Sequence, residues 1–170
     1  MSKVQGVSGY RWMARSFRPE FQVEEASTDD LEKVYSWLNP DGRTEDRRPN
    51  PNVTNFVAKR KSRVIGFVQL VRHPPEHHPY IGYWLFSLSV RLRYRGLGIG
   101  EALSQAVIEK AREKGAEELL LLIHDDNKPA VHLYHKLGFE KKSIPALDSK
   151  LEEEYHITGR RRLVMGVSLR

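Results

Sequence analysis

The feature that most constrains the fold of this chain is a run of glycines between a predicted strand and a predicted helix. Residues Tyr80–Val90 are strongly β-prone, and Gly98–Lys114 carries apolar side chains at helical spacing. The run Arg95-Gly96-Leu97-Gly98-Ile99-Gly100 joins them. Glycines leave backbone N–H groups uncovered, and a helix start adds further N–H groups and the positive end of its dipole. This stretch therefore predicts a cradle for the phosphates of an anionic ligand.

Two other phosphate-binding patterns do not fit the same stretch. No Gly-Lys-Ser/Thr follows the glycines, as a P-loop requires. A Rossmann site needs an acidic residue at the end of the next strand, but that strand, Leu119–Ile123, is apolar throughout, and the strand before the glycines sits mid-chain. The remaining alternatives are a phosphate ligand that is not a dinucleotide and a glycine-rich turn without a ligand.

The rest of the chain predicts one α/β domain, a mixed central sheet flanked by helices, in the order β-α-β-β-β-α-β-α-β-β. Its length of 170 residues suits a single domain. We expect residues 1–20 to form a leader packed on the body and residues 21–170 to form the domain. A long acidic loop is expected before the last strand. Strands are expected near Phe21–Val23, Thr54–Lys59, Arg63–Val71, Tyr80–Val90, Leu119–Ile123, after Phe139 and at Arg161–Leu169.

Composition excludes several classes of function. The chain has no cysteine, which removes disulfides, thiolate zinc sites and cysteine nucleophiles. The net charge of +6 comes from scattered basic clusters, a pattern more typical of solvated loops than of one nucleic-acid face. No stretch approaches the roughly 20 apolar residues of a membrane helix, and the N-terminus lacks a signal-peptide core. We therefore expect a cytoplasmic protein without nucleic-acid or membrane partners.

Two motifs together resemble the GNAT family of N-acetyltransferases. The pattern Arg95-x-x-Gly98-x-Gly100 resembles the acyl-CoA signature of that family. Downstream, Asn127, Ala130, Tyr134 and Leu137-Gly138-Phe139 resemble its second signature. The predicted order of elements also matches the family from residue 21 to the end, about nine-tenths of the chain. The resemblance implies the single-domain acyl-CoA N-acyltransferase fold and direct acetyl transfer from acetyl-CoA to an amine.

The residues of the second motif agree with a ligand-binding role. Asn127 and Tyr134 are seven residues apart, so on a helix they lie on nearly one face, with the small Ala130 between them. That face can lie beside an extended ligand. Taken alone, Asn127 is more often a helix N-cap and Tyr134 a core aromatic.

The resemblance also assigns roles to particular residues. The strand before the cradle would bond the pantetheine through its backbone, and the N–H of Leu88 would polarise the thioester carbonyl. Tyr134 would protonate the leaving thiolate. The residues expected to bind acetyl-CoA are Leu88, Ser89, Val90, Arg95, Gly96, Leu97, Gly98, Ile99, Gly100, Glu101, Asn127, Ala130 and Tyr134.

The general base is the point where the chain departs from its better-known relatives. Ribosomal-protein alanine acetyltransferases carry a glutamate where this chain has Leu122, and histone-type relatives carry one where it has Trp84. The base is then a water chain or another residue, for which His124 is a candidate, and Ser87 and Ser89 could bind substrate or relay a proton. We expect a small primary amine as acceptor. The alternatives are a peptide or protein acceptor and a catalytically silent CoA-binding module.

Other candidate groups carry weaker expectations. His77 and His78 lie in a proline-rich loop and could suggest a metal, but solvated histidines are favoured, so no metal is expected. The acidic residues before the last strand could attract a cationic amine or simply line a solvated helix face; they are Asp148, Glu152, Glu153 and Glu154. A monomer or homodimer is expected.

Overall fold

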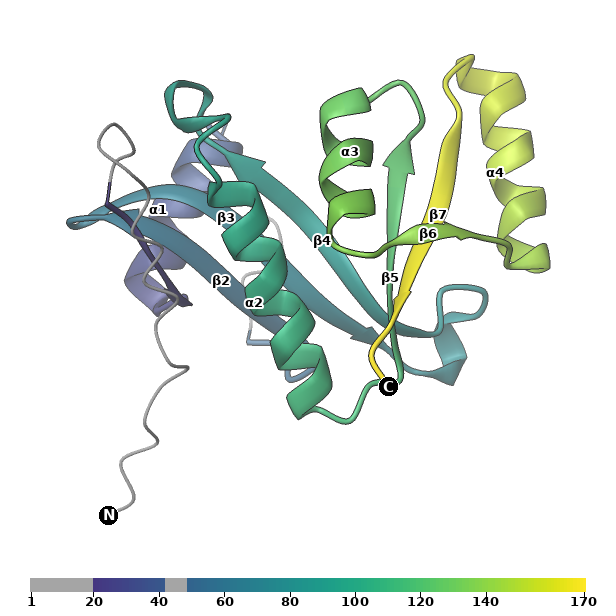
Figure 1. Ribbon diagram of the computed structural model, residues 1–170, viewed down its shortest axis with the longest axis horizontal. Helices are drawn as coiled ribbons and strands as arrows, with labels where there is room; N and C mark the ends of the chain where they lie inside the picture. The colour runs from purple at the N-terminus through teal and green to yellow at the C-terminus, as the bar shows by residue number, and fades with distance from the viewer. Residues whose placement is uncertain (1–19, 42–48) are drawn as a thin grey trace. The chain divides into compact units, whose positions relative to one another are not determined.

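The structure is a computed structural model, and it describes residues 20–41 and 49–170 (Figure 1). The expected leader therefore lies outside the described residues, apart from residue 20. Short 3-10 helices η1 (Pro75–His77) and η2 (Leu92–Tyr94) precede and follow β4. The other elements, in chain order, are β1 (Gln22–Glu25), α1 (Thr28–Leu38), β2 (Val53–Arg60), β3 (Arg63–His73), β4 (Gly82–Val90), α2 (Ile99–Glu113), β5 (Glu118–His124), α3 (Lys128–Lys136), β6 (Glu140–Lys142), α4 (Pro145–Thr158) and β7 (Arg162–Ser168).

The strands form a seven-stranded mixed sheet in the order β1-β2-β3-β4-β5-β7-β6. β1 pairs with β2 in antiparallel fashion, and β7 pairs antiparallel with both β5 and β6. β4 and β5 are parallel, with Trp84 opposite Leu120. A parallel pair needs a crossover connection, which α2 provides. The expected α/β fold, a mixed sheet flanked by helices, is confirmed.

The chain divides into two compact units, each of which is described by itself. The first unit comprises Met1–Gln69 and Ser87–Ala106, and the second comprises Leu70–Phe86 and Val107–Arg170. The first unit thus holds the end of β4 and the start of α2. The second unit holds β5, α3, β6, α4 and β7.

In the first unit, helices cover both faces of β2 and β3. Val34 of α1 is buried in one cluster with Val57 and Phe67, whereas Ala58 and Gly66 face Ile99 and Leu103 of α2. Successive strand residues point to opposite faces of the sheet, so Val57 faces α1 and Ala58 faces α2. Figure 1 shows α1 and α2 on opposite sides of these two strands.

A buried ion pair fixes the start of α1. Ser27 caps the helix, and its hydroxyl accepts a hydrogen bond from the Asp30 N–H, while the Asp30 carboxylate accepts from the Ser27 N–H. Lys59 of β2 lies 2.8 Å from the same carboxylate and 2.7 Å from that of Glu24. Asp30 is only 1% exposed, so its charge is balanced inside the unit.

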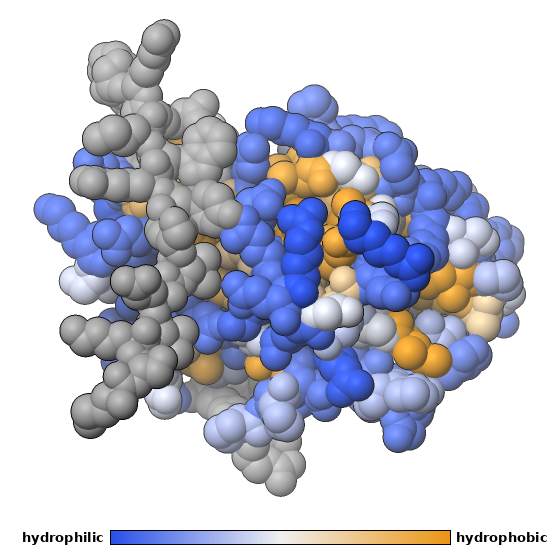
Figure 2. All heavy atoms as spheres, turned by 60° about the horizontal axis from the view of Figure 1, so that its bottom comes forward, coloured by the Kyte–Doolittle hydropathy of each residue, from blue (hydrophilic) through white to orange (hydrophobic). Residues whose placement is uncertain are grey.

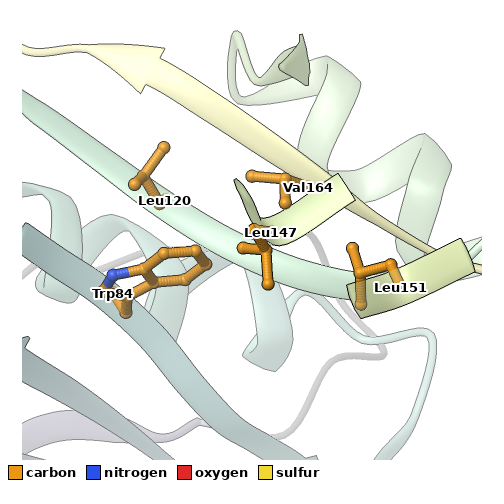
Figure 3. Packing of buried hydrophobic residues seen from close by; sticks show 5 residues of the cluster. All are labelled: Trp84, Leu120, Leu147, Leu151 and Val164. Carbon is orange, nitrogen blue, oxygen red and sulfur yellow. The ribbon is translucent and has the colours of Figure 1, made fainter. Parts of the chain in front are cut away.

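In the second unit, an apolar cluster lies between α4 and the sheet. Figure 3 shows its five buried members, which come from β4, β5, α4 and β7: Trp84, Leu120, Leu147, Leu151 and Val164. Tyr80, Phe86, Leu122 and Ile144 pack around it. We refer to these nine residues as the α4 cluster. Gly138, at the end of α3, approaches Val167, which points to the other face of β7 from Val164.

The expectation of a long acidic loop before the last strand is wrong. Helix α4 occupies this segment, which adds a helix to the expected order of elements. Pro145 sits in its first turn, Leu147 and Leu151 are spaced four residues apart and face the sheet, and Gly159 ends it with a φ of 69°. The many acidic residues between the two leucines and Gly159 concealed this pattern, and of these Glu152 and Glu153 are exposed.

On the face that Figure 2 presents, hydrophilic side chains surround smaller hydrophobic patches. Among the described residues, no helix has the length and apolar character needed to cross a membrane.

Candidate functional site

The predicted phosphate cradle lies in the first unit, between the end of β4 and α2. After Val90 the chain turns through η2. The Nε–H of Arg95 then donates a 3.0 Å hydrogen bond back to the Val90 carbonyl. Gly96 and Gly98 then adopt φ values of 75° and 85°, in the left-handed region that favours glycine. The glycines predicted from the sequence are therefore required by the backbone itself.

The start of α2 offers donors to an anion. The Gly98 carbonyl accepts the first helical bond, from the Ala102 N–H, so the N–H groups of Ile99 and Gly100 come before the regular bonding pattern. A Cβ atom on Gly96 would meet no heavy atom within 4 Å, so this part of the turn is open. Donors, open space and the helix dipole together suit a diphosphate group.

Close packing beneath the cradle sets the position of α2. A Cβ atom on Gly66 of β3 would lie 2.9 Å from Cδ1 of Leu103 and 3.0 Å from Cγ2 of Ile99. Only glycine allows this approach without displacing the first turns of the helix. Gly66 was not singled out from the sequence, because an isolated glycine in a strand does not reveal what approaches it.

The end of β4 is irregular immediately before Leu88. Ser87 has a φ of 58°, which is rare for a residue with a side chain and carries local strain. The Ser89 hydroxyl donates a 3.1 Å bond to the Ser87 carbonyl. This irregularity interrupts the regular alternation that would place Ser87 and Ser89 on one face. It also changes the direction of the backbone where the segment predicted to bond the pantetheine begins.

A pocket of about 410 Å³ lies beside α1 in the same unit. The Arg91 guanidinium lies 4.6 Å from the centre of the Trp37 ring, and its Nε donates to the Val64 carbonyl at 2.8 Å. Burial, and then the charge of Arg63, lowers the pKa of Arg91. Glu32, Lys33 and Ser36 complete the lining. No sequence pattern connects Trp37 with Arg91, since they meet only through packing.

The second predicted set lies in the other unit, on α3. Asn127 is the N-cap, and its Oδ1 accepts a 3.4 Å bond from the Ala130 N–H, which leaves the amide donors unused by that bond. Tyr134 is 5% exposed, and its ring packs edge-on against Phe139 with centres 5.4 Å apart. The capping and core roles weighed for these residues are thus both present. These two roles are compatible with ligand binding by the Asn127 amide N–H groups and the Tyr134 hydroxyl.

The α4 cluster contains both positions that carry a glutamate in better-known relatives. Trp84 is fully buried, and Leu122 packs against the same group of side chains (Figure 3). The Trp84 indole N–H donates to the Ile81 carbonyl at 3.4 Å. Neither position can supply a carboxylate, and apolar side chains surround both.

His124, the candidate base, ends β5 opposite Arg162 of β7. Its Nδ1 is buried and has no hydrogen-bond partner in the part of the chain that the structure describes. Arg162 donates to both carboxylate oxygens of Glu154, at 2.6 and 2.5 Å. These hydrogen bonds, with a smaller contribution from the charge of His124, lower the pKa of Glu154. His124 therefore lies beside a charged pair.

The acidic residues expected to attract a cationic amine mostly have partners within the chain. Glu152 accepts a 2.7 Å bond from Arg161, and Asp148 accepts a 2.6 Å bond from the Ser143 hydroxyl. Glu154 is paired with Arg162, and Glu153 is exposed. The pairing reduces the negative field that a cationic substrate would meet. Glu152 and Glu153 fit the solvated helix face that the sequence also allowed, whereas Asp148 and Glu154 are half-buried.

The described residues contain no group of three or more histidine, cysteine or acidic side chains that could hold a metal. His77 lies in η1 and contacts His73, a partner that was not singled out from the sequence. His78 ends the same short helix and is exposed.

Comparison with known proteins places these features in a family. The model described as "Acetyltransferase (GNAT) family" matches residues 10–139. The uncharacterized N-acetyltransferase YdgE of Bacillus subtilis is 28% identical over 140 residues, which are 82% of this chain and 85% of that protein. Mycothiol acetyltransferase of Paenarthrobacter aurescens is 32% identical over 142 residues, which are 80% of this chain but only 40% of that protein.

A solved structure agrees in fold. The PaiA N-acetyltransferase of Thermoplasma acidophilum, in complex with coenzyme A, superposes with a TM-score of 0.59 at 17% identity, covering 88% of this chain and 99% of that one. At this identity the likeness shows the fold.

Proposed function

Since this chain belongs to the acetyltransferase (GNAT) family, we propose that it moves the acetyl group of acetyl-CoA directly to the primary amine of a small molecule. The first part of this statement follows from membership: the chain is an acetyl-CoA-dependent N-acetyltransferase. The small-molecule acceptor and the roles of individual residues are the proposal.

The observation that carries the choice of acceptor is the content of the α4 cluster. Trp84 and Leu122 occupy the positions at which protein-modifying relatives place a carboxylate base, and both pack among apolar side chains. Burying a carboxylate there would be costly, because the side chains packed around both positions are apolar. An enzyme without either base differs in mechanism from those relatives, which favours a different acceptor. The name of the relative from Paenarthrobacter aurescens, which refers to the small molecule mycothiol, supports the same choice.

We assign the binding of acetyl-CoA to the cradle and to the end of β4. The N–H groups at the start of α2, next to Gly98, suit the diphosphate, and Arg95 adds a positive charge. The extended backbone from Leu88 to Val90 suits the pantetheine amides. We also assign Asn127 and Ala130, on the strength of the second family signature, to the binding of acetyl-CoA.

The chemistry requires two proton transfers. The amine attacks the thioester carbonyl, and the N–H of Leu88 stabilises the oxygen as it gains negative charge. When the tetrahedral species collapses, the C–S bond breaks and the Tyr134 hydroxyl protonates the departing thiolate. The proton lost by the amine passes to a water chain or to His124. The strained Ser87 residue immediately before Leu88 supports this assignment, because such strain concentrates at functional positions.

A thiol-release assay tests the acceptor. Purified protein and acetyl-CoA would be incubated with polyamines, aminosugars, free amino acids, and peptides that carry a free N-terminus or a lysine. We expect the highest kcat/KM with one of the small amines and no more than background release with peptides. Preference for a peptide would overturn the small-molecule acceptor while leaving acetyl transfer intact. The Gly98→Asp variant provides the background rate.

A further inference from the structure

Two histidines meet in the loop that joins β3 to β4. Nδ1 of His73, the last residue of β3, lies 2.8 Å from Nδ1 of His77 in η1. The ring centres are 5.0 Å apart and the ring planes are inclined by 49°. We propose that these two nitrogens form a bidentate site for a divalent transition-metal ion of the Cu²⁺ or Ni²⁺ type, distinct from the residues assigned to acetyl transfer.

The separation of the two nitrogens indicates the geometry of the site. An imidazole nitrogen binds such metals at roughly 2.0–2.1 Å. Two nitrogens 2.8 Å apart then subtend about 84–89° at the metal, close to the right angle of neighbouring ligands in a square-planar or octahedral complex. A tetrahedral zinc site would need them about 3.3 Å apart. The pair therefore suits a metal with tetragonal preferences.

The surrounding chain holds the ring of His73 and the backbone of His77 in place. The His73 ring stands edge-on to Phe86, with centres 5.9 Å apart, and also contacts Tyr80. The His77 N–H donates to the Pro74 carbonyl at 2.9 Å, and the His77 carbonyl accepts from the Tyr80 N–H at 2.8 Å. Because the two nitrogens already lie together, a metal needs only a rotation of each ring that turns its Nδ1 lone pair away from the other nitrogen.

The protonation of the pair is compatible with binding. The 2.8 Å contact between the two Nδ1 atoms requires at least one neutral ring, because two imidazolium rings would offer no hydrogen-bond acceptor. Without a metal, one Nδ1–H donates to the other Nδ1. When a metal binds, that proton moves through solvent to Nε2 of the same ring, so both Nδ1 lone pairs face the metal. Two neutral rings therefore exchange a hydrogen bond for two metal bonds without net proton release.

The remaining coordination positions fall to water. Among the residues that the structure describes, no third histidine or acidic side chain completes a cluster with this pair. The site is thus open, like a chelate on a surface loop rather than a closed structural site.

Copper titration of the full, untagged chain tests the site. We expect one Cu²⁺ per chain, an electron paramagnetic resonance spectrum with couplings to two nitrogens, and a higher melting temperature on binding. His77→Asn should weaken the affinity by about 10²-fold or more, because the second ligand no longer acts within the same molecule. His78→Asn, one position from His77 and in the same loop, is the matched control and should bind copper like the parent.

His77 is exposed, so its replacement is expected to leave the fold intact, which circular dichroism checks. Equal copper affinity in His77→Asn and the parent would overturn the proposal, as would a parent spectrum with a single nitrogen coupling. Neither histidine has a role in the proposed acetyl transfer. If the protein fails to acetylate any amine, that result counts against the proposed function and leaves the metal site untouched.

Discussion

Trp84 of β4 lies opposite Leu120 of β5 in the parallel register, and both side chains belong to the apolar cluster that α4 covers. The pair links sheet topology to chemistry, because position 84 is one where related enzymes place their base. In this protein the face of the sheet at position 84 belongs to the buried core. Helix α4 supplies Leu147 and Leu151 to complete it.

Truncation of Leu147 tests how far the second unit depends on α4. Leu147 is fully buried, so Leu147→Ala should lower the free energy of unfolding by about 2–4 kcal/mol through lost contacts and a cavity. Ile157→Ala, on the same helix at 85% exposure, should change it by less than about 0.5 kcal/mol. Urea denaturation of both variants measures the difference. Similar values for the two would mean that α4 contributes little to the core.

The buried pair of Lys59 with Asp30 makes stability depend on pH. Burial alone would raise the pKa of Asp30, but hydrogen bonds from Lys59 and Ser27 outweigh it and hold the pKa below its usual 3.8. The stabilisation is therefore present above pH 3.8 and is lost as the pH falls through the lower, folded pKa. Lys59→Met should cost about 2–3 kcal/mol at pH 7, because Asp30 is left buried without its cation.

At acidic pH the difference in the free energy of unfolding between Lys59→Met and the parent should become smaller, because protonated Asp30 no longer needs the cation. Lys33→Met is the matched control: Lys33 pairs with Asp29 at the surface, where the two side chains are 45% and 77% exposed. That change should cost less than about 0.5 kcal/mol. If the difference in the free energy of unfolding between Lys59→Met and the parent stays constant from pH 7 to pH 3, the assigned role of Asp30 is contradicted.

Sequence reasoning succeeded where a local pattern determines the structure. The glycines at 96 and 98, the Asn127 cap and the apolar run of β5 each depend on their own neighbours in the chain. It missed features that arise when distant segments meet, such as the approach of Gly66 to α2 or the contact between His73 and His77. Helix α4 was missed for a different reason. Its two apolar anchors are few, and its acidic face resembles a loop.

The cradle can be tested with two substitutions at one glycine. Gly98→Asp and Gly98→Asn impose the same positive φ on a side chain of the same size, so their backbone strain should be similar. Only aspartate adds a negative charge near the assigned diphosphate. We expect the Kd for CoA to be about 10–10³-fold higher for aspartate than for asparagine, measured by calorimetry. Equal affinities would place the diphosphate elsewhere.

The general base can be identified from a pH profile. His124→Gln keeps a polar side chain but cannot take up the proton of the amine near neutral pH. If a water chain serves as base, as we expect, kcat/KM of the variant should rise with pH as in the parent and lose little height. The exposed His135→Gln on α3 controls for general effects of histidine loss. Disappearance of the rising limb in His124→Gln alone would instead identify His124 as the base.

Tyr134 separates the proposed acid catalysis from simple packing. Tyr134→Phe keeps the ring that packs against Phe139, so the fold should survive with a loss of about 0.5–1.5 kcal/mol, the typical contribution of one hydrogen bond. It removes the proton that the departing thiolate requires, and positioned acids contribute roughly 10²–10⁴-fold to rate. The loss should appear in kcat more than in KM, because the interaction strengthens only as the sulfur gains charge. Tyr155→Phe on α4, where the ring stacks on Arg161, should leave kcat unchanged. If Tyr134→Phe turns over at the parent rate while chemistry limits that rate, Tyr134 is a packing residue and the thiolate leaves without its help.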